Sequence, residues 1–231
     1  MKPSSFERSA PSEYGRVVLI NSSQPGVNIK PRSTDVEPIE DLLTLAETAH
    51  GHLCAGQILG VRMAMLGCRR LGIDEPRGRD RKRLVTFVEI DRCATDAIGV
   101  VTGCRLGKRA LKFRDWGKMA ATFIDIPSDR AIRIAARESS KELARALHPE
   151  IENKNQQQML AYRELSDADL FSEEWVRVTL PAKEFPGYKG DRLACAKCGE
   201  GINYDRFVER GGQRLCQACA NPDEQIGRAH V

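Results

Sequence analysis

The sequence predicts an α+β fold, in which helices pack on a mostly antiparallel or mixed sheet and a small cysteine-rich domain follows at the C-terminus. The first observation is a helical period of apolar residues between residues 38 and 71, ahead of any strand-like run. The second is a set of runs rich in Val, Ile and Phe, which do not alternate strictly with helices as the strands of βαβ units would. The third is a pair of Cys-x2-Cys motifs close to the C-terminus.

The first two elements are expected to be helices joined by a short turn. Apolar residues recur at i, i+3, i+4 and i+7 over residues 42–49, and the pattern stops at Gly51. A second helix is expected over residues 55–71. It carries Gly56 and Gly60 one turn apart, and small residues at that spacing let another element approach closely.

Strand propensity and turn residues predict the remaining elements of the main domain. After a charged loop over 77–83 we expect, in order, a strand over 84–90, a helix over 94–101, a Gly-rich turn over 103–107, strands over 119–126 and 131–136, helices over 139–147 and 156–165, a short helix capped by Ser166, and a closing strand over 175–180. The turn Pro127-Ser128-Asp129 separates the two middle strands. Helices and strands in this order favour helices packed on one sheet.

Composition along the chain predicts two folded domains and flexible ends. We expect a flexible N-terminal arm over 1–35, a metal-binding α+β domain over 36–180, a linker over 181–190, a four-cysteine finger over 191–222 and a tail over 223–231. The arm is rich in Ser, Pro and charge, apart from one apolar run at Val17–Ile20 that could add a strand. The 231 residues are enough for one main core and a small appendage.

Composition also limits the classes of function. Charged residues make up 29% of the chain and apolar residues 41%, as in ordinary soluble proteins, and the net charge of +4 is too mild to imply nucleic acid. No apolar run is long enough to span a membrane, and residues 1–10 lack the apolar stretch of a secretion signal. We therefore expect a cytoplasmic protein, whose cysteines are thiols or metal ligands and not disulfides.

The four C-terminal cysteines form the most specific motif in the chain. Cys195 and Cys198 form one Cys-x2-Cys pair, and Cys216 and Cys219 form a second. Each pair places two sulfurs on one tight turn, and two such turns complete a tetrahedron around one zinc ion. Gly199 and the pair at 211–212 stand where the turns need unusual backbone angles. A thioredoxin-like redox pair is the alternative, but it needs only one such motif. The spacing predicts a structural zinc with no open position.

A second cluster of possible metal ligands follows the first predicted helix. His50, His52 and Cys54 point the same way if the segment is extended, and this ligand set suits zinc or a similar divalent metal. Cys93, which follows a predicted buried strand, could add a ligand opposite His52 and Cys54 and leave one position open, as catalysis requires. In the alternative interpretation His50 caps its helix, Cys54 is a small buried residue and Cys93 caps the next helix.

The Gly-rich turn over 103–108 carries further candidates. Cys104 could be another ligand or a nucleophile, whereas Cys68 falls on the inner stripe of its helix and is expected to pack in the core. The turn superficially resembles a phosphate loop, but its glycines are one residue too close, and Arg109 stands where Ser or Thr should bind magnesium. ATP binding is therefore rejected. With Lys108 the turn could still hold an anionic group, or it could be a solvated basic loop.

Several motifs in order resemble the FmdE family of formylmethanofuran dehydrogenase subunits. They are HGHLCAG over 50–56, VE at 88–89, CATDAI over 93–98, GCRLGK over 103–108, DWGKMAATF over 115–123 and SDADLF over 166–171. The resemblance covers roughly residues 40–180. The tail is similar to the four-cysteine fingers of the DksA/TraR type, which contact proteins as often as nucleic acid.

The resemblance implies an α+β core with a metal site at His52, Cys54 and Cys93, sometimes followed by a four-cysteine finger. The family is associated with molybdenum- or tungsten-dependent formylmethanofuran dehydrogenase systems, although many members occur where no such pathway is obvious. Two departures lie beside the expected site. Ala55 replaces a proline, and the pair at 109–110 replaces Gly-Asn, so the ligand of this chain could differ.

Three functions follow from these observations. The first is a metal-binding accessory or subunit of a molybdenum- or tungsten-type oxidoreductase system, with partner subunits and a core metal, most simply a second zinc. The second is a stand-alone metalloenzyme of unnamed reaction, with catalytic candidates His50, Asp96, Cys104 and Lys108. The third is a metal-responsive regulator whose finger docks on protein or nucleic acid, although acidic neighbours offset its arginines. The glycine-spaced helix and short apolar strands would suit a homodimer. Whether the chain is an enzyme stays open.

Overall fold

The computed structural model describes residues 37–224, which form parts of two compact units that divide at Leu180. The predicted arm over 1–35, with its possible strand at Val17–Ile20, lies outside the described residues, as does most of the predicted tail. The larger unit holds the sheet and the helices, and the smaller unit holds the four C-terminal cysteines. Each unit is described by itself below.

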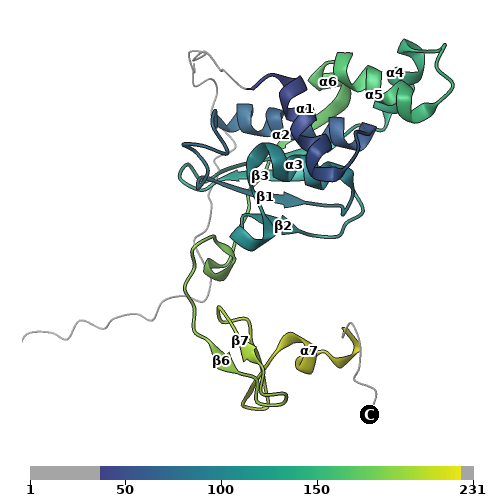
Figure 1. The fold of residues 1–231 in the computed structure, drawn as a ribbon. Helices are drawn as coiled ribbons and strands as arrows, with labels where there is room; N and C mark the ends of the chain where they lie inside the picture. The colour runs from purple at the N-terminus through teal and green to yellow at the C-terminus, as the bar shows by residue number, and fades with distance from the viewer. Residues whose placement is uncertain (1–36, 225–231) are drawn as a thin grey trace, which may run out of the picture. The chain divides into compact units, whose positions relative to one another are not determined.

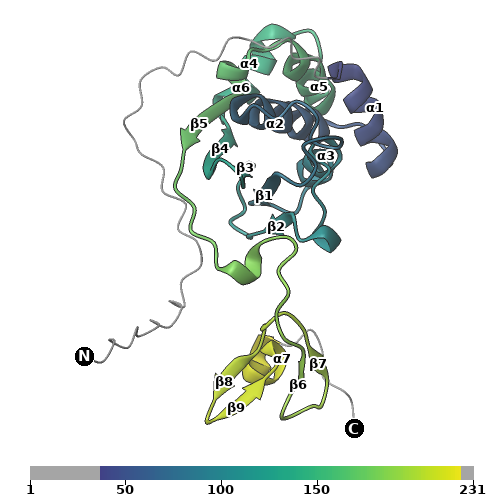
Figure 2. The ribbon, with the colours of Figure 1, turned by 90° about the vertical axis from the view of Figure 1, so that its left-hand side faces the viewer.

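The larger unit is built on one mixed sheet (Figure 1). Its strands are β1 (Leu84–Val88), β2 (Leu111–Phe113), β3 (Ala120–Asp125), β4 (Arg130–Ala136) and β5 (Phe171–Trp175). They follow one another in the order β2-β1-β3-β4-β5, which Figure 2 shows from the side. Only β1 and β2 are parallel, and the other pairs are antiparallel. The predicted α+β class with a mostly antiparallel sheet is confirmed.

The helices form a layer over this sheet (Figures 1 and 2). They are α1 (Ile39–His50), α2 (Ala55–Leu71), α3 (Cys93–Thr102), α4 (Ser139–Leu147), α5 (Lys154–Glu164) and α6 (Asp167–Leu170), with the 3-10 turn η1 (Leu106–Lys108) before β2. Helix α2 is the central one, since it contacts β3, β4, α1, α3 and α5. Most of its residues are buried, because both the sheet and the other helices cover it.

Glycines let α2 lie close to its neighbours, as was predicted for Gly56 and Gly60 but not for Gly67. A Cβ atom at Gly60 would lie 2.5 Å from the backbone oxygen of Ala94 in α3. A Cβ atom at Gly67 would lie 2.5 Å from the ring of Phe123 in β3. Both separations are shorter than any real Cβ contact, so only glycine allows α2 to approach α3 and the sheet this closely.

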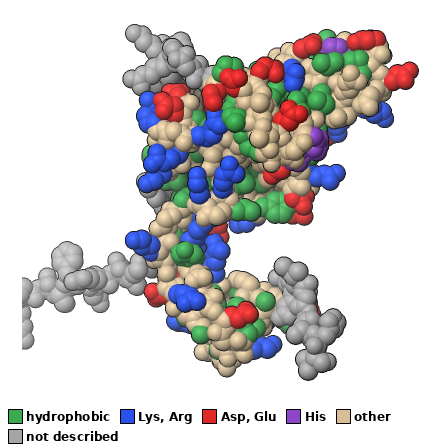
Figure 3. Space-filling view, in the orientation of Figure 1, with side chains coloured by type: hydrophobic (Ala, Val, Ile, Leu, Met, Phe, Trp, Pro, Cys, Tyr) green, Lys and Arg blue, Asp and Glu red, His purple; other side chains and the backbone are tan. Residues whose placement is uncertain are grey.

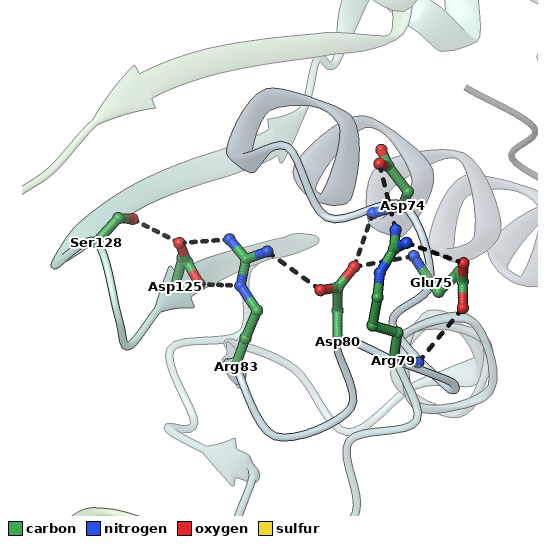
Figure 4. A network of polar contacts seen from close by, with 7 residues as sticks. All are labelled: Asp74, Glu75, Arg79, Asp80, Arg83, Asp125 and Ser128. Atoms are coloured by element: carbon green, nitrogen blue, oxygen red, sulfur yellow. Dashed lines mark hydrogen bonds and ion pairs between the residues drawn. The ribbon is translucent and has the colours of Figure 1, made fainter. Parts of the chain in front are cut away.

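A polar network fastens the loop over 74–83 to the end of the sheet (Figure 4). The Arg83 guanidinium donates two hydrogen bonds to the Asp125 carboxylate, at 3.0 and 2.9 Å, and a third to Asp80 at 3.1 Å. The Asp80 carboxylate also accepts from the backbone N–H groups of Asp74 and Glu75, at 3.2 Å each. Burial opposes ionisation of Asp80, but these donors hold its pKa below the usual value. The loop is therefore held in one conformation.

Two strand assignments differ from the sequence expectation. The closing strand predicted over 175–180 is wrong, because β5 ends at Trp175. It pairs with β4, so that Phe171 lies opposite Ala136 and Trp175 opposite Ile132, where the ladder ends. The charged side chain of Glu173 fits this edge position because Arg70 binds it through two hydrogen bonds. Strand β2 was not predicted, since three residues are too few to show a period.

The smaller unit consists of short hairpins and one helical turn. Its elements are η2 (Ala182–Glu184), β6 (Leu193–Ala194), β7 (Gly201–Ile202), β8 (Val208–Arg210), β9 (Gln213–Leu215), α7 (Gln217–Ala220) and η3 (Pro222–Glu224). Strands β8 and β9 are joined by Gly211 and Gly212, which both have positive φ, and Gly199 has a φ of 79°. The glycine conformations predicted from the sequence are confirmed. From residue 37 to residue 224, no helix combines the length and apolar character needed to cross a membrane.

Candidate metal centre

Three helix ends meet at one place in the larger unit. His50 is the last residue of α1, Cys54 is the N-cap residue of α2, and Cys93 is the first residue of α3. Gly51 has a φ of 95° and ends α1, so the chain turns back within four residues to begin α2. The glycine-mediated contact of α2 with α3 then brings the start of α3 beside the start of α2.

The ligand atoms of these three residues lie within 4.8 Å of one another. A cation at ordinary metal–sulfur and metal–nitrogen distances of about 2.0–2.3 Å could therefore contact two thiolates and one imidazole after small side-chain adjustments. All three residues are only half-buried. Two sulfurs and one nitrogen suit zinc or a similar divalent metal, and three protein ligands leave a fourth position open. The donor set fits a divalent metal.

Asp96 orients the imidazole. The Nδ1 atom of His50 lies 2.8 Å from Oδ2 of Asp96, one turn further along α3 than Cys93. With Nδ1 bonded to the carboxylate, Nε2 is the nitrogen that can bind a cation. A carboxylate behind a histidine ligand fixes its tautomer and raises its basicity, as in many metal sites. The bond also ties α1 to α3 across the site.

The surroundings of Cys93 disfavour its charged form in the absence of a cation. Burial raises the pKa of the Cys93 thiol, and so do a hydrogen bond and like charge from Cys54. A bound cation would reverse this repulsion and hold both sulfurs as thiolates. The site is narrow, since a Cβ atom at Gly56 would lie 3.2 Å from the Cβ atom of Cys93 and 3.7 Å from Sγ of Cys54.

Gln57 is a neighbour of the site that sequence reasoning missed. Its side chain is fully buried, and its Nε2 donates to the backbone oxygen of Cys93 at 2.8 Å. Its Oε1 atom has no hydrogen-bond partner within the part of the chain that the structure describes. The amide links α2 to the first turn of α3 and so holds Cys93 in place. A buried polar residue one turn after Cys54, on the inner face of a helix, was the available signal.

The structure brings together a different histidine from the one predicted as a ligand. His50, and not His52, lies with Cys54 and Cys93; His52 is exposed, and its ring lies 4.8 Å from the His50 ring. His52 was the ligand that the family resemblance implied. An extended segment would have pointed both histidines the same way, but His50 ends a helix, so strict alternation does not apply. Asp96, a catalytic candidate, binds His50. Metal binding at this place stays a prediction.

Cys104 and Lys108 lie away from this group. Cys104 is buried beside β1 with its sulfur 3.6 Å from Thr86 Oγ1, and burial raises the pKa of its thiol. A buried neutral thiol suits packing better than nucleophilic attack. Lys108 is exposed at the end of η1. Cys68 is buried as expected, and burial raises the pKa of its thiol to about 12.

The four C-terminal cysteines form a second, closed ligand group. The ligand atoms of Cys195, Cys198, Cys216 and Cys219 all lie within 4.8 Å of one another. The Cys216 N–H donates to the Cys195 sulfur at 3.3 Å, and the Cys219 N–H donates to the Cys216 sulfur at 3.3 Å. Backbone donors from Cys198 and Cys216 lower the pKa of the Cys195 thiol to about 6. The cluster fits a structural zinc site, which four thiolates fill completely.

Two protein families match different parts of this chain, and each match contains one of the two ligand groups. The family described as "FmdE, Molybdenum formylmethanofuran dehydrogenase operon" matches residues 49–172, just over half of the chain. The prokaryotic DksA/TraR C4-type zinc finger matches residues 187–225. The first match contains His50, Cys54 and Cys93, and the second contains all four cysteines of the finger.

Two individual proteins are similar over most of the chain. A protein of Archaeoglobus fulgidus described as a probable S-adenosyl-L-methionine-binding protein is 29% identical over 89% of this chain, which spans 66% of that relative's own length. The crystal structure of a tungsten formylmethanofuran dehydrogenase FmdE-like protein from Syntrophus aciditrophicus shares the fold, with a TM-score of 0.57 at 19% identity. That match covers 86% of this chain and all of the other. The chain belongs to the FmdE family and carries a C-terminal zinc finger of the DksA/TraR type.

Proposed function

We propose that this metal-binding FmdE-like protein is an accessory protein or subunit of a molybdenum- or tungsten-type formylmethanofuran dehydrogenase-like oxidoreductase system. In this proposal the larger unit holds a divalent metal through His50, Cys54 and Cys93, and the finger holds zinc. The observation that carries it is the convergence of these three ligand atoms from three helix ends within 4.8 Å. The family match supports the class of system in which the metal is used.

The bound metal would supply a Lewis acid with one exchangeable position. The chain's own residues would do the rest. Cys54 and Cys93 hold the cation between two helix N-termini, where negative sulfur is favoured. His50 completes the set, and Asp96 keeps its Nδ1 occupied. Such a site can bind a thiol, carboxylate or water of a substrate or partner at its open position.

Metal content is the decisive measurement. Elemental analysis of the wild-type chain is expected to give two metals, and a Cys54→Ser, Cys93→Ser variant is expected to give one. His52→Ala is the matched control, because its imidazole is adjacent but outside the ligand group, and it should keep both metals. His50→Ala should lose the core metal or bind it weakly. One metal in the wild type would defeat the proposal. Loss of the core metal in His52→Ala, but not in His50→Ala, would identify His52 as the histidine ligand in place of His50.

A stand-alone metalloenzyme is the second candidate, and the His50–Asp96 pair favours it. A carboxylate bonded to an imidazole beside an open metal position can help to hold or move a proton. This function requires turnover by the isolated chain, lost on chelation and in Cys93→Ser but kept in His52→Ala. A chain that binds its core metal and shows no activity without partner subunits would support the accessory role.

The archaeal relative supplies a ligand to test. Its description as a probable S-adenosyl-L-methionine-binding protein, with similarity over 89% of this chain, supports trying that ligand here. Equilibrium dialysis of the metal-loaded chain with labelled S-adenosyl-L-methionine is the direct experiment. Saturable binding would extend the proposed function to that ligand, and its absence would confine the property to the relative.

A further inference from the structure

A basic cavity lies in the larger unit, next to the candidate metal centre but separate from its ligands. Its volume is about 370 Å³, and it is bounded by the last turns of α1 and α3, the loop over 74–83 and the turn that contains η1. Four of its lining residues are cationic: Arg77, Arg81, Arg105 and Lys108. None of its lining residues is acidic. Figure 3 shows Lys and Arg side chains gathered on the side of the larger unit where this loop and turn lie.

Among residues 37–224, few acidic side chains neutralise this positive charge. Arg77 forms an ion pair with Glu37. By contrast, Arg81, Arg105 and Lys108 form no ion pair with any acidic side chain between residues 37 and 224; Arg81 donates only to the backbone oxygen of Gly78, at 3.4 Å. Cations that converge on one concavity without counter-charges repel one another, and an anion removes that repulsion.

The cations are carried by backbone that is already held in place. The loop with Arg77 and Arg81 is fastened at Asp80, which accepts two backbone N–H groups and the Arg83 guanidinium (Figure 4). On the other side, Gly103 has a φ of 68°, and a Cβ atom there would lie 3.2 Å from Cγ of Arg77. The loop and the turn are thus in direct contact. A preformed site loses little entropy when a ligand binds.

The cavity also has an apolar wall. Leu45 of α1 is 39% exposed and faces the same cavity as Ala49 and the buried Val100 of α3. The volume lies at the lower end of the range for small-molecule sites, and it exceeds what one inorganic ion needs. An apolar wall with several cations on one side suits an organic body that carries a doubly charged group. Arginine binds phosphate oxygens through two parallel hydrogen bonds, and lysine adds a point charge.

We infer that this cavity binds a phosphorylated small molecule, with its phosphate against Arg81, Arg105 and Lys108 and its organic part against Leu45 and Val100. A concave site of this size favours a small ligand over the backbone of a nucleic acid, which needs an extended basic track. The inference does not depend on the proposed function, because the cavity shares no residue with the metal ligands.

The same two helices, α1 and α3, line the cavity and carry the His50–Asp96 pair. His50 of α1 bonds Asp96 of α3, whereas Leu45 and Val100 of the same helices line the cavity, so the two helices run antiparallel. Val100 follows Asp96 by four residues, a rise of about 6 Å along α3. A ligand in the cavity therefore lies about one helical turn from the His50–Asp96 pair.

Calorimetric titration of the full chain with adenosine monophosphate and with inorganic pyrophosphate tests the inference. Citrate, which is highly charged but carries no phosphate, is the comparison anion. Saturable binding of adenosine monophosphate, about tenfold or more tighter than citrate, is expected. The Arg105→Ala, Lys108→Ala variant should bind at least about tenfold more weakly, since it loses two charge-assisted contacts. Pyrophosphate should bind through the same two residues.

Arg79→Ala is the matched control. Arg79 lies on the same loop and is more exposed than Arg77, but it does not line the cavity and interacts with Asp74 and Glu75 instead. Its removal should leave adenosine monophosphate binding unchanged. Circular dichroism and metal content, both expected to match the wild type, show that the double variant is folded.

Three results would overturn the inference: no saturable binding of either phosphate probe, citrate binding as tightly as adenosine monophosphate, or equal loss in Arg79→Ala and the double variant. Binding of a duplex oligonucleotide that depends on Arg105 and Lys108, without binding of the small probes, would assign the surface to nucleic acid instead. A wild-type chain that binds no core metal would defeat the proposed function, but it would not affect this test of the cavity.

Discussion

The two cysteine sites of this chain differ in where their ligands come from. In the finger, four cysteines between Cys195 and Cys219 supply every ligand, and short hairpins hold them. In the larger unit, His50, Cys54 and Cys93 come from the ends of three helices and meet only because those helices pack. The finger has too few buried residues to fold without a metal, whereas the larger unit has an extensive core. Metal should therefore determine the fold of the finger and have little effect on the fold of the larger unit.

Metal removal should show the largest difference. Chelation, or Cys195→Ser, is expected to unfold the finger, because structural zinc contributes about 10–16 kcal/mol to folding in such domains. The larger unit should keep its melting temperature to within a few degrees. Two-dimensional NMR of the chain, with and without chelator, would show which resonances collapse. Loss of dispersion in the larger unit as well would mean that the core metal also supports the fold.

A change in helix packing should affect the core site alone. Gly60→Ala places a methyl group where only 2.5 Å separates it from Ala94, so α3 must shift away from α2. We expect a loss of about 3 kcal/mol in unfolding free energy and weaker core metal binding, with the finger unchanged. Gly107→Ala is the control, since a Cβ atom there contacts nothing within 4 Å. Thermal denaturation and metal analysis would measure both effects.

The larger unit should also depend on pH through its loop network. Asp80 has a pKa held below its usual value in the folded state, so its contribution is complete above about pH 4 and is lost as the pH falls further. Asp80→Ala, which leaves the N–H groups of Asp74 and Glu75 and one Arg83 donor unpaired, should cost about 2 kcal/mol at pH 7. Its effect should shrink below pH 4. Urea denaturation at pH 7 and pH 3 would show this, and an equal loss at both would contradict it.

A substitution at Asp96 tests whether a residue that only positions a ligand affects metal binding. Asp96→Asn keeps the shape of the side chain but removes the charge of the group that bonds Nδ1 of His50. We expect core metal affinity to fall by about tenfold or more, as for other carboxylates behind histidine ligands. Asp91→Asn is a control on an exposed neighbour before α3. Competition with a metal indicator would measure the affinity. An unchanged affinity in Asp96→Asn would show that Asp96 does not position His50 for metal binding.

The same contrast explains how far the sequence could predict the structure. The finger was predicted with its glycines, since its ligands and turns are local. The helices from Ile39 to Leu71 were also predicted, because their period is long. The core ligand geometry depended on where α1 ends. Alternation did not distinguish His50 from His52, the family resemblance implied His52, and the end of the helix presents His50. Strand β5 differed for a related reason. Pairing with β4 places the strand at Phe171–Trp175, which contains two glutamates, and not at residues 175–180, where apolar residues alternate.

The smallest effect is expected for a substitution in the finger that sets backbone strain against the stabilisation by zinc. Gly212 has a φ of 75° in the β8–β9 turn, and a Cβ atom there meets no neighbour, so Gly212→Ala introduces backbone strain without a clash. The strain is about 1 kcal/mol, well below the contribution of zinc. The variant should therefore keep its zinc and its fold and release zinc slightly faster to a chelator. Complete unfolding of the finger by this substitution would mean that the hairpin, and not the metal, stabilises it.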